Sequence, residues 1–302
     1  MSETAVTRLI IGFSRGSLSD RIARALVAPL SLALGKEVVV ESMPGENGQT
    51  AARTVAEAQG DGSVLFIATL GTHALARHIN HALPYDPLHD FKCVSLIAQA
   101  PLLLACHPDV GARSAADVIR LAKARPGELT YATSAIGGAP HLAAALFQHI
   151  ACVTMKHVCY AETERLYRDL EAGRVSLSFN NVVSMLPRCN GGTLRPLGVT
   201  AASRMAIAPD VPTLGESGVP GYEVTNWVGI VAPASMPARL VEQLSSALRD
   251  VVQTDELRDA WQKQGIVARG TSHVAFAAFV AREIERWGRI AGELTATAEH
   301  VD

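Results

Sequence analysis

Several patterns that mark large classes of protein are missing from this sequence. Aromatic residues make up only 5% of its 302 residues, and the net charge of −2 comes without any cluster of lysine and arginine. A nucleic-acid-binding surface usually needs such a basic stripe, so we expect no nucleic-acid partner. The longest apolar runs, at 101–106 and 229–234, fall far short of the roughly 20 residues that a membrane span requires. Direct membrane insertion is therefore not expected either.

Metal and nucleotide motifs are missing too. The five cysteines show no C-x-x-C spacing and no zinc spacing with histidine, and the ten histidines contain no H-x-x-x-H pair. We interpret the cysteines, at 93, 106, 152, 159 and 189, as small buried hydrophobic residues, and their odd number leaves at least one unpaired. The glycine-containing turn at 12–20 is neither G-x-G-x-x-G nor a P-loop. We expect no metal and no cofactor.

Hydrophobic residues are plentiful, at 48% against 19% charged residues, which is enough for full cores. Segments with strand-like and helix-like patterns alternate along the chain, with turns between them. Strands are predicted at 7–13, 36–41, 64–69, 101–107, 128–133, 175–179, 194–199 and 222–232. Helices are predicted at 20–34, 50–58, 114–124, 140–150, 237–253, 255–264 and 273–289. The repeated order of strand, turn and helix is typical of an α/β protein with parallel strands.

The length of the chain exceeds the ~100–200 residues of an average domain, so two lobes are expected. A loop rich in proline and glycine at 209–221 ends the second block of strands and helices. Because the last helices follow without a sheet of their own, we expect them to return to the first lobe. The first lobe is then 1–100 plus 222–302, and the second is 101–221. Two chain crossings between open sheets predict a hinged cleft, and ligands of such sheets bind beyond the carboxyl ends of strands.

Three turns that follow predicted strands carry the candidate binding site. Exposed N–H groups at a helix N-terminus, together with hydroxyl groups, can hold an anion. The first turn contributes Phe13, Ser14, Arg15, Gly16 and Ser17. The second turn contributes Thr72 and His73, and the third, in the other lobe, contributes Thr133, Ser134, Gly137 and Gly138. Two such turns from different lobes predict a clamp for a small molecule with a carboxylate.

A series of short motifs runs in one order along nearly the whole chain, from residue 9 to about residue 292. It includes Met43-Pro44-Gly45-x-x-Gly48, Gly71-Thr72-His73-Ala74, Leu83-Pro84-Tyr85-Asp86-Pro87, Pro209-Asp210-Val211-Pro212-Thr213 and Trp227-x-Gly229. In its order and spacing the series resembles the Bug family, the substrate-binding receptors of tripartite tricarboxylate transporters.

The resemblance implies a periplasmic-binding-protein fold, type II-like, with two lobes, open and mainly parallel sheets, and a hinged cleft that closes on an organic carboxylate. It also implies membrane transporter subunits as partners, no catalysis, and neither metal nor cofactor. The location implied is periplasmic; residues 1–8 show no secretory signal, so a cytoplasmic location stays open. In the family, ligand contacts come from the first and third turns, the Gly-Thr-His turn and a Phe-Asp-Asn stretch. The Phe-Asp-Asn stretch adds Asn180 and Asn181 to the candidate ligand-binding residues, and the Trp-x-Gly motif adds Trp227.

The sequence departs from the family pattern at the expected cleft. Ser14-Arg15-Gly16-Ser17 stands where the family has Pro-Pro-Gly-Gly, and Asn180 replaces an acidic residue. The second-lobe loop, commonly Ser-Gly-x-Gly-Ser, carries Ile136 and has lost one hydroxyl. These changes mean that a ligand known for the family cannot be transferred to this chain by sequence alone.

Two other functions stay open from the residues alone. One is a cleft enzyme, an isomerase or hydrolase, that would use His157, Cys159 and Glu162 as base, thiol and orienting acid. On a strand, residues 157 and 159 share one face and 162 lies on the other, which disfavours that set. The other function is a cytoplasmic small-molecule sensor on the same fold. A turnover screen and the upstream coding sequence would separate these alternatives from a binding protein.

Overall fold

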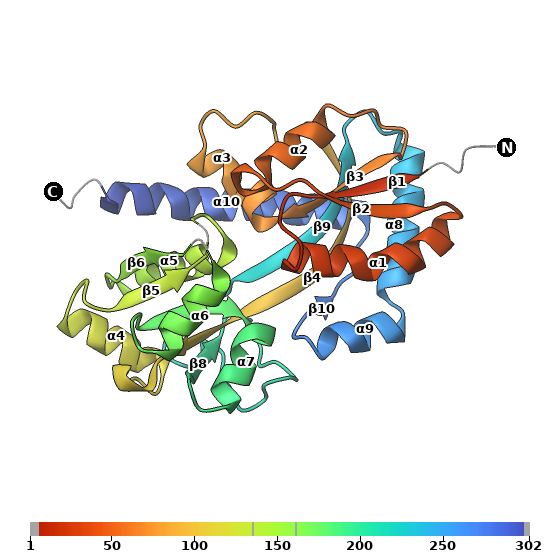
Figure 1. The fold of residues 1–302 in the computed structure, drawn as a ribbon. Helices are drawn as coiled ribbons and strands as arrows, with labels where there is room; N and C mark the ends of the chain where they lie inside the picture. The colour runs from red at the N-terminus through yellow and green to blue at the C-terminus, as the bar shows by residue number, and fades with distance from the viewer. Residues whose placement is uncertain (1–5, 135, 161, 299–302) are drawn as a thin grey trace. The chain divides into compact units, whose positions relative to one another are not determined.

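The computed structural model describes residues 6–134, 136–160 and 162–298 (Figure 1). Residues 1–5, which belong to the segment inspected for a leader, and Ala135, in the third turn, lie outside the described residues. The chain divides into two compact units. Unit 1 comprises Met1–Gln99, Trp227–Trp261 and Val267–Asp302, and unit 2 comprises Ala100–Asn226 and Gln262–Ile266.

The unit boundaries differ from the lobe limits expected from the sequence at residue 100 and at two short segments. Residues 222–226 belong to unit 2, where the Val224 N–H donates to the Thr200 carbonyl and the Thr200 hydroxyl donates to the Val224 carbonyl. Residues 262–266 also belong to unit 2, because Gly265 lies against Val182 and Met205. Both segments are fixed by contacts distant in sequence, which local patterns cannot reveal.

The sheet of unit 1 begins with three parallel strands in the order β2-β1-β3. Their bounds are β1 (Thr7–Ile11), β2 (Val38–Ser42) and β3 (Val64–Thr69). β9 (Thr225–Pro233) runs antiparallel to β3, and β10 (Val267–Ala268) runs antiparallel to β4 (Phe91–Cys106). The prediction that the C-terminal segment contains no strand is therefore wrong, because it contains β10. A strand of two residues leaves no recognisable pattern in the sequence.

Helices cover the strands of unit 1 on both faces. Helix α1 (Leu18–Leu34) packs on β1 and β2 and against α8 (Ala238–Val252), while α2 (Gln49–Ala56) contacts β1 and β3 from the other side (Figure 1). Right-handed crossovers to strands on either side of β1 place the two helices on opposite faces. The remaining helical segments of the unit are η1 (Glu46–Gly48), η2 (Leu70–Leu75), α3 (Ala76–Ile79), α9 (Asp255–Gln262) and α10 (His273–Ala298).

Unit 2 repeats the same strand order. Its parallel strands β5 (Thr130–Thr133), β6 (Lys156–Cys159) and β7 (Leu177–Asn181) lie in the order β6-β5-β7. The second half of β4 runs antiparallel to β7, and β8 (Arg195–Val199) runs antiparallel to β4. The helical segments are η3 (Pro108–Val110), α4 (Ala115–Ala124), α5 (Ala139–Ala151), α6 (Thr163–Glu171) and α7 (Val182–Asn190).

The sheets of both units are mixed. The three leading strands of each unit are parallel, as predicted, whereas β9 and β4 run antiparallel to β3 and β7. "Mainly parallel" is therefore too strong a description. The α/β class and the strand–helix alternation are those the sequence predicts, and β4 begins at Phe91 rather than at residue 101.

Helix α10 carries a buried carboxylate in the core of unit 1. The spacing of Glu283, Arg286 and Arg289 predicts a solvated ion-pair face, but Glu283 is only 9% exposed. Its Oε2 atom accepts from the indole N–H of Trp227 at 3.0 Å and of Trp287 at 3.2 Å. Arg289 pairs with the neighbouring Glu285 instead. The expected pair with Arg286 is present, with 3.6 Å between Nη1 of Arg286 and Oε1 of Glu283, but the carboxylate is buried rather than solvated because the fold brings two indole donors to its other oxygen.

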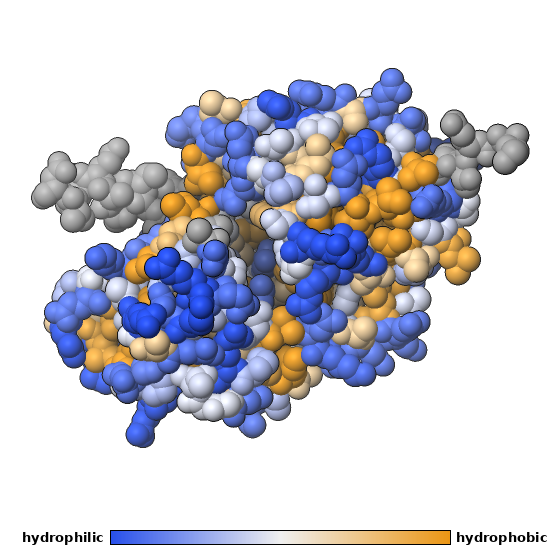
Figure 2. Space-filling model, in the orientation of Figure 1, coloured by the Kyte–Doolittle hydropathy of each residue, from blue (hydrophilic) through white to orange (hydrophobic). Residues whose placement is uncertain are grey.

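The molecular surface in Figure 2 is hydrophilic over most of the face shown, with hydrophobic residues in separate patches. No helix among the described residues has both the length and the apolar composition to cross a membrane.

Candidate functional site

The three loops at the carboxyl end of the parallel strands of unit 1 meet one another closely. A Cβ atom added to Gly12, directly after β1, would lie 2.5 Å from the Cα atom of Gly48. A Cβ atom added to Gly48 would lie 2.9 Å from Cγ2 of Thr72, and Gly48 has a φ of 88°. Glycine is needed at both positions because the backbones of the β1–α1 and β2–α2 loops touch there.

The first loop already holds a carboxylate of its own. Asp20, 3% exposed in the first turn of α1, accepts from the Gly16 N–H at 2.9 Å and from Arg24 Nε at 2.7 Å. Its own N–H donates to the hydroxyl of Ser17, the N-cap of the helix. The Gly16 N–H predicted to hold a ligand is thus used by Asp20. Ser14 and Arg15, at the tip of the loop, are exposed.

The turn after β3 has its side chains inside the unit. Thr72 and His73 are fully buried, and the Thr72 hydroxyl lies 3.1 Å from Nδ1 of His73. Thr69 and Thr72 form a reciprocal capping box, and the Tyr85 hydroxyl donates to the Thr72 carbonyl at 2.7 Å. These contacts fix the shape of the turn, so the two side chains predicted to touch ligand serve here to position its backbone.

The His73 ring is neutral in this setting. It lies among aromatic rings, with centroid distances of 4.7 Å to Phe91 and 5.8 Å to Phe66. Burial lowers the pKa of His73 to about 3, since the interior penalises the charged form. Its Nε2 atom is buried without a hydrogen-bond partner among the described residues.

In unit 2, two histidines hold the loop between β5 and α5 at both of its ends. His157 Nε2 lies 2.7 Å from the hydroxyl of the buried Thr133, and His141 Nδ1 accepts from the Gly137 N–H at 3.2 Å. The imidazole rings are 4.7 Å apart, and Tyr131 stacks on His157 at 4.8 Å. Ser134 is left exposed at the tip. The two histidines therefore anchor the loop at Thr133 and Gly137, and the exposed Ser134 between these anchors is accessible to a ligand.

The same contacts bear on the catalytic alternative. Burial, and then the neighbouring His157, lower the pKa of His141 to about 4, and burial also lowers the pKa of His157. Nε2 of His157 is engaged by the Thr133 hydroxyl, and the Cys159 side chain is exposed. No group of three or more His, Cys, Asp or Glu in the described part of the chain is arranged to hold a metal ion.

Asn180 and Asn181 end β7, the strand next to β5. The Asn181 N–H donates to Oδ1 of Asn180 at 3.0 Å. Two of their amide atoms, Nδ2 of Asn180 and Oδ1 of Asn181, are buried and have no hydrogen-bond partner in the described structure. Buried polar groups are usually hydrogen-bonded, so these two atoms are available to a water molecule or a ligand.

Trp227 is placed differently from the other candidate residues. Its side chain is fully buried, with ring centroids 5.9 Å from Phe276 and 5.5 Å from Phe279. Its single donor is spent on Glu283. The geometry therefore assigns Trp227 to the packing of α10, and we leave it out of the proposed site.

Strand order groups the remaining candidate residues within each unit. β1 and β3 are neighbours, which places the Phe13–Ser17 turn beside the Thr72–His73 turn. β5 and β7 are neighbours, which places the loop from Thr133 to Gly138 beside Asn180 and Asn181. Sequence reasoning missed Asp20, His141 and His157 as supports of these loops. Asp20 four residues after Gly16 was a readable signal, whereas the stacked imidazoles come from separate elements.

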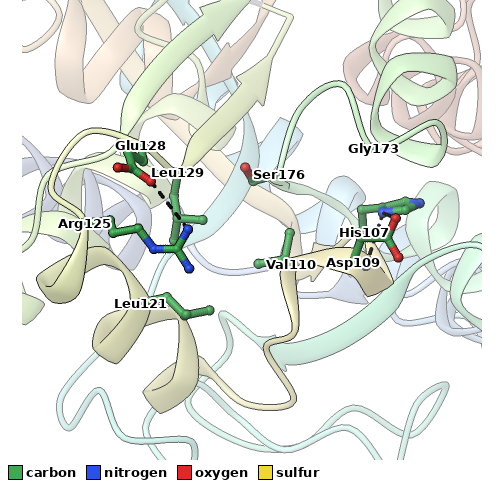
Figure 3. A pocket seen from close by; sticks show the side chains of 9 residues that line it. All are labelled: His107, Asp109, Val110, Leu121, Arg125, Glu128, Leu129, Gly173 and Ser176. Carbon is green, nitrogen blue, oxygen red and sulfur yellow. Dashed lines mark hydrogen bonds and ion pairs between the residues drawn. The ribbon is translucent and has the colours of Figure 1, made fainter.

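A surface pocket of about 270 Å³ opens at the amino ends of the parallel strands of unit 2, opposite the candidate loops (Figure 3). It lies near the first residues of β5 and β7, with Leu129 and Ser176 in its wall, rather than near the turns at their ends. Arg125 forms an ion pair with Glu128, and Nδ1 of His107 lies near the carboxylate of Asp109, at 3.6 Å in each case. The pocket is thus separate from the candidate loops, and its arginine is already beside a carboxylate.

Comparison with known proteins gives this geometry a context. Residues 22–295 match the family model described as tripartite tricarboxylate transporter family receptor. The chain belongs to this family. The predicted relationship is confirmed, and with it the two-lobed binding-protein fold and the function as a solute-binding receptor.

Relatives of this receptor are similar over nearly their full length. A protein encoded between tcbD and tcbE of Pseudomonas sp. strain P51 is 31% identical, over 96% of this chain and 86% of that protein. BugT of Bordetella pertussis is 28% identical, over 96% of this chain and 89% of BugT. None of this similarity by itself names a ligand for this receptor.

Solved structures are similar to the receptor in fold and in sequence. The R. palustris protein Rpa4515 with adipate is 34% identical with a TM-score of 0.86, over 96% of this chain and 97% of that one. MatC of Rhodopseudomonas palustris with bound malate is 27% identical with a TM-score of 0.83, over 95% and 99%.

Proposed function

We propose that this receptor captures a small organic carboxylate outside the cytoplasm and delivers it to the membrane subunits of a tripartite tricarboxylate-type transporter. Family membership and the adipate and malate held by two structural relatives support a carboxylate as the solute. A third similar structure, 28% identical with a TM-score of 0.84, is described as a periplasmic transporter, which supports the location. Units 1 and 2 would be the two lobes.

One observation carries the proposal: in each unit, polar turns lie side by side at the carboxyl end of the parallel strands. Unit 1 offers the exposed Ser14 and Arg15, and unit 2 offers the exposed Ser134 together with two buried asparagine atoms that have no hydrogen-bond partner among the described residues. Hydroxyl, amide and guanidinium donors match the oxygens of a carboxylate. Membership of a family of solute-binding receptors supports binding without turnover, which we propose for this chain.

A ligand panel followed by thermal unfolding tests the proposal. At 100-fold excess over its dissociation constant, a ligand that binds only the folded chain adds ~2.7 kcal/mol. For a chain of this size such a gain raises Tm by several degrees, at ~2–4 °C per kcal/mol. NMR spectra of each acid after incubation should show it unchanged. If mono-, di- and tricarboxylates, amino acids and aromatic acids all leave Tm unchanged, the carboxylate proposal is wrong.

A further inference from the structure

The loop between β5 and α5 ends in two glycines that give it little support of its own. Gly137 has a φ of 77°, a left-handed conformation that favours glycine. Gly138 is the N-cap residue of α5 and has no side chain with which to cap the helix. The conformation of the loop therefore depends strongly on side chains that reach it from neighbouring elements.

His141 reaches the loop from α5, and the geometry specifies which ring nitrogen it uses. His141 is the third residue of the helix, and its Nδ1 atom accepts from the Gly137 N–H at 3.2 Å. A backbone N–H only donates, so Nδ1 carries no proton and the proton of the neutral ring is on Nε2. In a capping box the third residue likewise accepts from a backbone N–H before the helix. His141 thus replaces the cap that Gly138 cannot form.

A protonated His141 cannot make this contact. An imidazolium ring has a proton on both nitrogens, so its Nδ1 proton would point at the Gly137 N–H. The N-terminus of a helix also disfavours a positive charge. Among the described residues, the titratable rings that face His141 are His157 on β6 and Tyr131 on β5, at centroid distances of 4.7 and 6.3 Å. Neither supplies a negative charge at neutral pH, since burial raises the pKa of Tyr131, and α5 contains no acidic residue.

His157 holds the other end of the loop through its other nitrogen. Its Nε2 atom lies 2.7 Å from the hydroxyl of the buried Thr133, the last residue of β5. A hydroxyl donates and accepts, so this contact requires Nε2 at that place but no particular tautomer. The His157 ring is held between Tyr131 at 4.8 Å and His141 at 4.7 Å. The two histidines therefore fix both sides of the exposed Ser134 through different nitrogens.

We propose that His141 and His157 position the β5–α5 loop for the solute, and that a proton on His141 releases both the loop and the solute. Neither histidine has to touch the solute, and both act through the loop. This inference rests on the proposed function and adds to it the residues that shape the site and a dependence of capture on pH.

The sign and the upper limit of the pH effect follow from the two states of the loop. In the held loop, burial and then the neighbouring His157 lower the pKa of His141 to about 4. In a released loop the ring regains its ordinary pKa of about 6.5. A group whose pKa is lowered in the held state stabilises that state above its ordinary pKa and ceases to do so as the pH falls. Between pH 7 and pH 5 protonation therefore favours release by about 20-fold, which is the largest loss of affinity expected.

Substitutions that keep one nitrogen position at a time test the positioning. The amide of asparagine occupies the place of Nδ1, and the amide of glutamine occupies the place of Nε2. In calorimetric titrations at pH 7 with adipate or malate, the acids held by the two structural relatives, His141→Asn and His157→Gln should bind within about twofold of wild type. His141→Gln and His157→Asn should bind about three- to tenfold more weakly. A histidine that only fills space would not give opposite patterns at the two positions.

A matched control and a pH series complete the test. His149→Asn changes a histidine near the other end of α5 and should bind as wild type does. From pH 7 to pH 5 the wild type should lose affinity, by up to about 20-fold, and His141→Asn should lose clearly less. The ionisation of the acid itself cancels in this comparison, because the same acid is used with both proteins.

A measurement on the wild type covers the case in which a variant does not fold. Nitrogen-15 NMR spectra of histidine-labelled protein should show Nδ1 of His141 without a proton at pH 7. A proton on that nitrogen, equal effects of asparagine and glutamine at position 141, or equal pH dependence in wild type and His141→Asn overturns the inference and leaves the proposed function standing. If neither adipate, malate nor any acid of the ligand panel binds the wild type, both fall.

Discussion

Arg15 should provide most of the charge that holds the solute in unit 1. Asp20 already occupies the Gly16 N–H and lies at the N-terminus of α1, so its negative charge offsets the attraction of the helix end for a second anion. The exposed guanidinium of Arg15 remains at the tip of the loop, with a planar pair of donors that fits a carboxylate. Arg15→Ala should therefore cost ~1.5–3 kcal/mol of binding free energy, the range for hydrogen bonds to charged groups.

Calorimetric titration of one organic acid measures the effect as a loss of affinity of roughly 10- to 150-fold. Arg15→Lys should recover only part of it, because an ammonium cannot reproduce the two-pronged contact. Urea unfolding should change by less than ~0.5 kcal/mol, as expected for an exposed loop side chain. Arg53→Ala, which removes an exposed arginine from α2 of the same unit, is the matched control. Equal affinity of wild type, Arg15→Ala and Arg15→Lys would refute the argument.

Four further predictions concern the supports of the site and the core. Unfolding free energy should fall as the pH drops from about 6.5 to about 4, because the unfolded chain protonates His141 first. His141→Asn, which keeps an acceptor for the Gly137 N–H, should flatten this dependence by up to one proton in urea titrations at pH 7, 5.5 and 4.5, and an unaltered slope would contradict it. Asp20→Ala should cost ~2–3 kcal/mol in urea unfolding by removing the carboxylate at the α1 N-terminus; a cost below ~0.5 kcal/mol would contradict its role. Glu283→Leu should cost ~3–5 kcal/mol because it leaves two buried indole donors unpaired, whereas Glu285→Leu, at an exposed position, should cost under ~0.5 kcal/mol. If the two lobes close on the solute, X-ray scattering should give a smaller radius of gyration with saturating ligand than without it, and identical profiles would contradict closure.

Elements set by local signals could be predicted from the sequence. Ser114 caps α4 as its spacing to Asp117 predicts, with the Asp117 N–H donating to its hydroxyl at 3.1 Å. The sequence alone does not decide among Ser17, Ser19 and Asp20 as the cap of α1; the structure uses Ser17, and Asp20 turns back to accept from the Gly16 N–H. A single cap residue can be recognised from local spacing. The choice among several neighbouring polar residues depends on the conformation of the loop before the helix, which local spacing does not determine.

Features that depend on distant contacts could not be predicted. Helix α7 was missed because it has only two buried residues, Val182 and Met185, to set a helical period. Helix α6 was also missed, although its buried Leu166, Tyr167 and Leu170 stand at helical spacing and could have been recognised. The turns of the candidate site were found, since glycine and hydroxyl residues after a strand mark them. Which side chains point inward was not, because burial of Thr72 and His73 is decided by Phe91 and Tyr85, which come later in the chain.

Native mass spectrometry of the gently purified protein tests the central claim most directly. The account predicts a mass increase equal to one small organic acid per chain, release of that acid unchanged on denaturation, and return of the same increase when the acid is added back. A spectrum that shows only the mass of the chain, and that stays so with every acid of the panel in excess, would contradict the account.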